Sequence, residues 1–249
     1  MKKVLFLFLL MCHFSVSAQD KVDIRSESWY GLMTSGQISK NWSLWLDSHF
    51  VPELFFIIRP GITYHSPSNR INITGGYAHL DLTTPFSEGE LIRDERRPWM
   101  QLVYKFPEKD GGSTGFRFRY DARFRSKFRG NELIDGFDFN HRLRLNNNLR
   151  KRIGVSEKLG ANFSLSLVQE GLLTLGPDRV DVPLEYRLFT LLGIQKNGVT
   201  VSPGYHLRVQ SLNSGQNRLI HGFVLWINMN YQFKNIKQRI LRDTAGDKI

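Results

Sequence analysis

Between Thr114 and Arg129, apolar and charged side chains alternate almost without interruption. The even positions from Phe116 to Phe128 are mostly aromatic, and the odd positions beginning at Arg117 are almost all charged. Successive side chains of a β-strand point to opposite faces of the sheet. The stretch therefore predicts a strand with one apolar face and one charged face.

The same period of two recurs along the chain, and no segment keeps a helical period over several turns. We count about eleven strands, but bacterial single-chain barrels normally have an even number. We therefore expect ten or twelve, with a strand missed or merged within residues 22–33, near Trp29 and Tyr30. The clearest alternating segments are residues 42–50, 56–64, 71–77, 100–106, 114–129, 137–150, 163–167, 184–194, 199–210 and 225–233.

Short connections alternate with longer ones. The segments 39–41, 66–70 and 196–198 are tight, whereas 83–96, 130–136 and 174–182 are longer and richer in polar residues, Gly and Pro. Tight turns at one end and long loops at the other are typical of outer-membrane barrels. The pattern predicts an all-β fold, a single antiparallel transmembrane β-barrel of about 10–12 strands. A soluble β-sandwich remains the alternative, because a second sheet could also cover the apolar faces.

The N-terminus predicts export. Residues 1–18 combine a basic start, a short apolar run and small residues ending at Ala18, as in a cleaved secretory signal peptide. Its removal takes away Cys12, the chain's one cysteine, and with it any disulfide or thiolate chemistry. We expect residues 19–233 to form the barrel and residues 234–249 to form a basic tail.

Net charge narrows the range of partners. Residues 19–249 contain 32 basic and 23 acidic residues, a net charge of +9. Export argues against nucleic acid, so outer-membrane lipid, lipopolysaccharide and small anionic solutes are the expected partners.

The last strand ends at Phe233, an aromatic signal of the kind that the barrel-assembly machinery reads. The predicted location is the cell outer membrane.

The charged faces predict the lining of a basic lumen. Two interpretations stay open: an ion-pair network that holds the barrel rigid and closed, or a water-filled passage that favours anions. The expected basic wall consists of Arg117, Arg119, Arg123, Arg125, Lys127, Arg129, Arg142 and Arg144. The expected acidic partners in the lumen are Asp47, Asp121, Asp138, Glu170 and Glu185.

Evidence for enzymatic chemistry is weak. An outer-membrane lipid acyl hydrolase or transferase is the alternative function, with His79 and Asp81 as the best base and orienting acid. No G-x-S-x-G elbow and no closely spaced histidine motif occurs, so we assign no catalytic residue, metal or cofactor. A structural barrel or small passive channel is the main expectation.

Several short blocks follow one another along the chain: Trp42–Trp45, Arg59–Tyr64, Gly75–Ala78, Arg97–Leu102, Phe118–Phe124 and Phe139–Arg144. Together they resemble a family of exported barrels, common in Bacteroidota and known only as a domain of unknown function, DUF2490. The resemblance covers nearly the whole exported chain. It implies an outer-membrane β-barrel and no particular reaction, so it transfers no catalytic residue.

Overall fold

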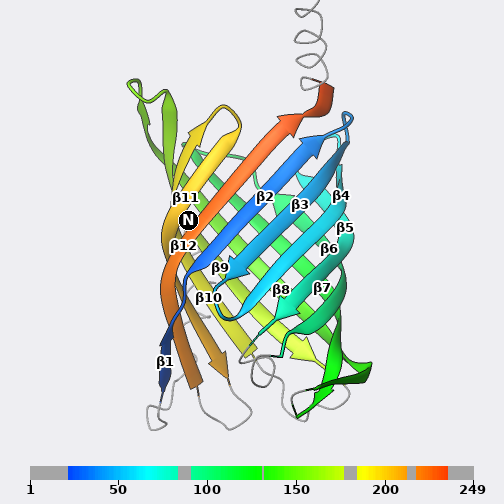
Figure 1. Ribbon diagram of the computed structural model, residues 1–249. Helices are drawn as coiled ribbons and strands as arrows, with labels where there is room; N and C mark the ends of the chain where they lie inside the picture. The colour runs from blue at the N-terminus through cyan, green and yellow to red at the C-terminus, as the bar shows by residue number, and fades with distance from the viewer. Residues whose placement is uncertain (1–21, 84–90, 131, 177–183, 212–216, 235–249) are drawn as a thin grey trace, which may run out of the picture.

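The computed structural model describes residues 22–83, 91–130, 132–176, 184–211 and 217–234. These residues form one continuous sheet that curls into a closed barrel (Figure 1). The predicted signal peptide and almost all of the predicted tail lie outside the described residues. Within the described part, no helix has the length and apolar content needed to cross a membrane. The strands are β1 Asp23–Ser26, β2 Trp29–Gln37, β3 Trp42–Val51, β4 Phe55–His65, β5 Ile71–Leu82, β6 Arg93–Lys105, β7 Gly112–Arg129, β8 Glu132–Ser156, β9 Ala161–Leu175, β10 Leu184–Lys196, β11 Val199–Ser211 and β12 Asn217–Gln232.

From β2 to β12, each strand pairs antiparallel with the next one along the chain. The barrel closes where β12 meets the N-terminal strands, and both β1 and β2 pair with β12 in parallel. β1 lies along residues 218–221 and β2 along residues 224–232, so the two occupy a single place in the ring. The barrel is therefore a closed, mixed barrel of eleven strands.

Two expectations about the ring are wrong. The strand number is odd rather than even, and the sheet is not antiparallel throughout. The second error follows from the first. In a ring of consecutive hairpins, the first and last strands run in opposite directions only when their number is even. With eleven strands, β2 and β12 run the same way, which Figure 1 shows as two arrows pointing toward the same end.

Polar and apolar side chains are distributed inside out relative to a soluble protein. Among the described residues, 23 buried side chains are polar or charged and 14 are hydrophobic, while 38 large hydrophobic residues are exposed. β7 illustrates the alternation: Phe116 and Phe118 are 41% and 45% exposed, whereas Arg119 and Asp121 are 2% and 0% exposed. The aromatic face predicted for this strand thus points outward, and its charged face points into the barrel.

Hydrophobic side chains fill part of the interior. One cluster brings Trp29, Val51, Val168, Phe189, Leu191 and Val224 together from five strands. A second cluster contains Ile57, Ala78, Leu80, Leu82 and Trp99. Because these side chains point inward from strands that are otherwise polar inside, they occupy space that water would fill in an open pore.

Candidate functional site

The interior is divided along each strand. Next to the tight turns at the upper end in Figure 1, the inward side chains line an open polar cavity. Farther along the same strands, the inward side chains are arginines and carboxylates. β6 shows the order clearly, with Gln101 and Lys105 lining the cavity and Glu95 and Arg97 in the ion-pair region.

Glu95 is the centre of the largest charge cluster. Its carboxylate is fully buried and accepts hydrogen bonds from three guanidinium groups. Arg123 bonds both oxygens at 2.7 Å, and Arg125 bonds Oε2 at 3.0 and 3.1 Å. Arg97 donates to Oε1 from Nε at 2.8 Å and also from Nη2. Charge-assisted bonds of this kind are the strong ones, and they fix β6 and β7 relative to each other.

Asp121 forms the second cluster and is also fully buried. Arg119 Nε donates to its Oδ1 at 3.0 Å, and Arg144 Nε lies 2.9 Å from Oδ2. The Arg119 guanidinium also stacks on the Trp99 ring, 4.3 Å from its centroid. This cation–π contact joins the charged cluster to the hydrophobic one.

Asp47 pairs with Arg59 on the neighbouring strand at 2.7 Å and with His49 at 2.8 Å. The other ring nitrogen of His49 accepts a hydrogen bond from Trp29 Nε1 at 3.1 Å. His49 Nε2 therefore carries the proton that points at the carboxylate. This chain of contacts links β2, β3 and β4 through the interior.

A further charge cluster, centred on Glu170 and Glu185, extends to the closing seam. Glu170 accepts from Arg117 at 2.7 Å and lies 3.4 Å from Arg187. Arg187 and Arg208 share Glu185, and Arg208 also pairs with Glu27, from the kink between β1 and β2. A carboxylate from the N-terminal segment thus enters the interior beside β12.

Gly222 makes this entry possible. A Cβ atom at Gly222 would lie 1.8 Å from the carbonyl oxygen of Glu27. The Glu27 amide also donates to the His221 carbonyl at 3.0 Å. The missing side chain therefore lets the kinked backbone approach β12 closely enough for Glu27 to reach Arg208.

Most of the residues predicted for the lumen wall meet in these clusters. Arg117, Arg119, Arg123, Arg125 and Arg144 pair with carboxylates, whereas Arg142 donates to Thr174 at 3.2 Å. Of the predicted acids, Asp47, Asp121, Glu170 and Glu185 lie within the clusters. The side chain of Asp138 is 47% exposed and contacts Arg93 at 3.3 Å.

Lys127 and Arg129 do not belong to the wall, contrary to the prediction. The pairing of β7 with β8 shifts register between Ser126 and Lys127, where two residues of β8 are left without a partner on β7. Phe128 then packs under the buried guanidinium of Arg93, at 4.4 Å, while Lys127 and Arg129 are exposed. The strict alternation read from the sequence ends at this bulge.

Sequence reasoning missed several residues of the network. Glu95 was missed because residues 83–96 read as a loop, and Arg97 because the next alternating segment was taken from residue 100, although Arg93, Glu95 and Arg97 alternate in the sequence as inward residues do. The sequence pattern around Glu27 does not indicate its role, because that role depends on how the ring closes. The other missed members are Arg59, Arg187 and Arg208.

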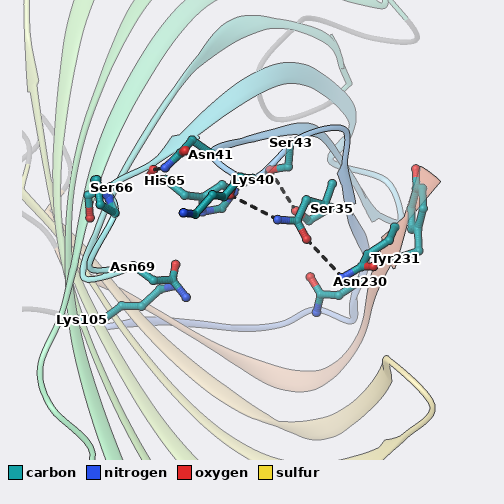
Figure 2. A pocket seen from close by; sticks show the side chains of 13 residues that line it. Ser35, Lys40, Asn41, Ser43, His65, Ser66, Asn69, Lys105, Asn230 and Tyr231 are labelled. Carbon is teal, nitrogen blue, oxygen red and sulfur yellow. Dashed lines mark hydrogen bonds between the residues drawn. The ribbon is translucent and has the colours of Figure 1, made fainter. Parts of the chain in front are cut away.

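The cavity at the tight-turn end, here called the vestibule, consists of two overlapping hollows of about 450 and 630 Å³. Figure 2 looks into it and shows Lys40, Asn41, His65 and Lys105 around the mouth, with Asn230 and Tyr231 on the side of β12. The side chains that both hollows share are Ser35, His65, Asn69, Lys105 and Asn230.

A serine, a histidine and an asparagine lie in line at the vestibule wall. Ser43 Oγ is 2.8 Å from His65 Nε2, and the Asn72 amide is 3.1 Å from His65 Nδ1. The amide of Asn72 fits its surroundings when its nitrogen faces His65 Nδ1 and the Ile71 carbonyl, and its oxygen faces Lys105 Nζ, each at 3.1 Å. His65 Nδ1 then accepts, so Nε2 holds the proton and donates it to Ser43. In that tautomer His65 cannot take the Ser43 proton, and the arrangement does not activate a nucleophile.

The pair predicted for a lipid enzyme lies on the outer surface. His79 Nε2 is 3.3 Å from Asp81 Oδ1, and both side chains are about half exposed. Within the described part of the chain, no serine hydroxyl is hydrogen-bonded to His79, and no group of three or more His, Cys, Asp or Glu residues could hold a metal ion.

Comparison with known proteins gives one match. No curated protein and no solved structure matches the chain. A family model described as "Protein of unknown function (DUF2490)" matches residues 26–219, well over half of the chain and nearly the whole ring of strands. The protein therefore belongs to this family of unknown function, and its own described residues form a β-barrel.

Proposed function

We propose that this protein is an integral outer-membrane β-barrel of a Gram-negative bacterium, exported by its signal peptide as expected for Bacteroidota barrels. We further propose that its lumen is closed and its role structural rather than catalytic or conducting. The distribution of side chains carries the proposal: charged groups are buried inside, and aromatic and aliphatic groups face out. Only a nonpolar solvent makes such an outer surface favourable over a whole barrel.

Aromatic pairs beside the tight turns support insertion in a bilayer. Trp42 packs against Tyr64 with ring centroids 5.2 Å apart, and Tyr104 against Phe106 at 4.9 Å. Phe116 continues the series, 5.7 Å from Phe106. Aromatic rings at this level match the girdles that anchor barrels at the interface between lipid and water.

The contact geometry favours the closed interpretation over the passage. Side chains that would line a water-filled pore are instead buried: Glu95, Asp121 and His206 are each 0% exposed. The guanidinium groups donate to shared carboxylates, and the hydrophobic clusters fill the neighbouring space. An anion would therefore have to break buried ion pairs to pass.

Location and conductance test the two parts separately. After membrane fractionation, the protein should float with outer-membrane markers and resist extraction by carbonate; recovery in the soluble fraction would contradict membrane insertion. Purified barrel in planar bilayers should give no steady discrete conductance, with heat-dependent mobility on gels proving that it is folded. Reproducible anion-selective current steps would contradict the closed lumen.

A further inference from the structure

The vestibule carries an excess of positive charge. Four basic side chains line it, Lys40, Arg70, Lys105 and Arg117, against one acidic side chain, Glu108. The rest of its lining is mostly neutral polar groups. In the ion-pair region, by contrast, carboxylates from several strands meet the arginines. Arg117 also pairs with Glu170, so Lys40, Arg70 and Lys105 are the basic groups of the vestibule that have no ion pair with a carboxylate among the described residues.

Its floor also holds hydrogen-bond donors that have no partner. Trp45 Nε1 and Arg117 Nε are shielded from solvent and make no hydrogen bond within the described residues. Arg119 Nη2 and Trp99 Nε1 are in the same state but do not line the vestibule, and Arg119 is only 2% exposed. A buried polar atom without a partner costs free energy, so such atoms mark places where water or a ligand completes the site.

We propose that the vestibule binds a small anionic solute bearing carboxylate or phosphate groups. Both unpartnered atoms of the vestibule lining, Trp45 Nε1 and Arg117 Nε, are donors, which calls for a ligand rich in acceptor oxygens. The basic lining calls for negative charge, which water does not supply. The hollows lie at the axial mouth beside the turns, so the solute enters from water rather than from the bilayer (Figure 2). Their volumes suit a molecule the size of a di- or tricarboxylate or a pyrophosphate.

Calorimetric titration of the full exported chain in detergent tests this proposal. Citrate and pyrophosphate are the anionic probes, and sucrose is the neutral one, all at low ionic strength. At least one anion should bind with a stoichiometry near one, and sucrose should not. Titration with the two anions separates carboxylate from phosphate preference. Binding in detergent depends on neither membrane location nor conductance, so this experiment can fail while the proposed function stands.

Variants locate the site. Lys105→Gln should weaken binding about tenfold, because a charge-assisted contact is lost. Trp45→Phe keeps an aromatic ring but removes the Nε1 donor, and should weaken binding several-fold. Lys158→Gln makes the same change of charge in the β8–β9 turn, outside the vestibule lining, and should leave affinity unchanged. Absence of binding by either anion up to about 10 mM would overturn the proposal. Equal weakening by Lys158→Gln would also overturn it, since that outcome indicates a nonspecific charge effect.

Discussion

Replacing Glu95 by Gln tests whether the ion-pair network stabilises the barrel. The carboxylate is fully buried and accepts six hydrogen bonds from Arg97, Arg123 and Arg125. Glutamine keeps one acceptor oxygen but places an amide donor against guanidinium donors. Three positive groups then lose their shared counter-charge in a site that water does not reach.

The cost of breaking a buried ion pair is about 3–5 kcal/mol, most of it from the uncompensated charge left behind. We therefore expect Glu95→Gln to lower the free energy of unfolding by about that amount. The assay is urea unfolding of the barrel refolded in phospholipid vesicles, followed by tryptophan fluorescence. Glu157→Gln, the same change at an exposed position in the β8–β9 turn, is the matched control and should stay within about 0.5 kcal/mol of the parent.

A double variant separates charge from packing. Glu95→Gln with Arg123→Gln removes one of the unpaired guanidinium groups, so its cost should be smaller than the sum of the single costs by at least about 1 kcal/mol. Strict additivity would show that the two side chains do not act as a pair. A Glu95→Gln variant as stable as the parent would refute the network as a source of stability.

Three further pairs of substitutions test other parts of the structure in the same unfolding assay. Phe118→Arg should cost about 2–4 kcal/mol if that ring meets lipid, whereas Leu159→Arg, at an exposed turn, should cost far less. Arg123→Gln should be destabilising and Lys127→Gln neutral, because Arg123 is buried against Glu95 whereas Lys127 is exposed; equal effects would contradict this placement. Gly222→Ala should cost about 1–3 kcal/mol or prevent closure, since its Cβ would meet the Glu27 carbonyl at 1.8 Å. The matched change Gly171→Ala has nothing within 4 Å and should be tolerated, and an equally tolerant Gly222 would show that the seam is not tightly packed.

The face of each side chain could be predicted from the sequence because it depends on a local rule. Alternation assigned Phe118 to the outside and Arg119, Asp121 and Arg123 to the interior without knowledge of any neighbour. The same rule failed at Lys127, because a bulge is a property of two strands and their register rather than of one strand.

Partners could not be predicted for a similar reason. Arg187 joins Glu170 of the neighbouring strand and Glu185 of its own, a choice fixed by register and by the tilt of the strands. Glu27 reaches Arg208 only because the ring closes between β12 and the N-terminal segment. Closure depends on residues that are far apart in the sequence. Neither the alternation of side chains nor the turn residues show whether the number of strands is odd or even.

The interior and the vestibule are linked by charge. Glu95 is shared by three arginines and Asp121 by two, so the clusters satisfy their carboxylates more fully than their guanidinium groups. The unpartnered Nε of Arg117 lies in the vestibule lining, where β7 approaches the open mouth. Excess positive charge is least costly there, because water or an anion can reach it. The closed lumen and the anion-binding mouth that we propose would thus share one electrostatic origin, the pairing of many arginines with fewer carboxylates inside one ring.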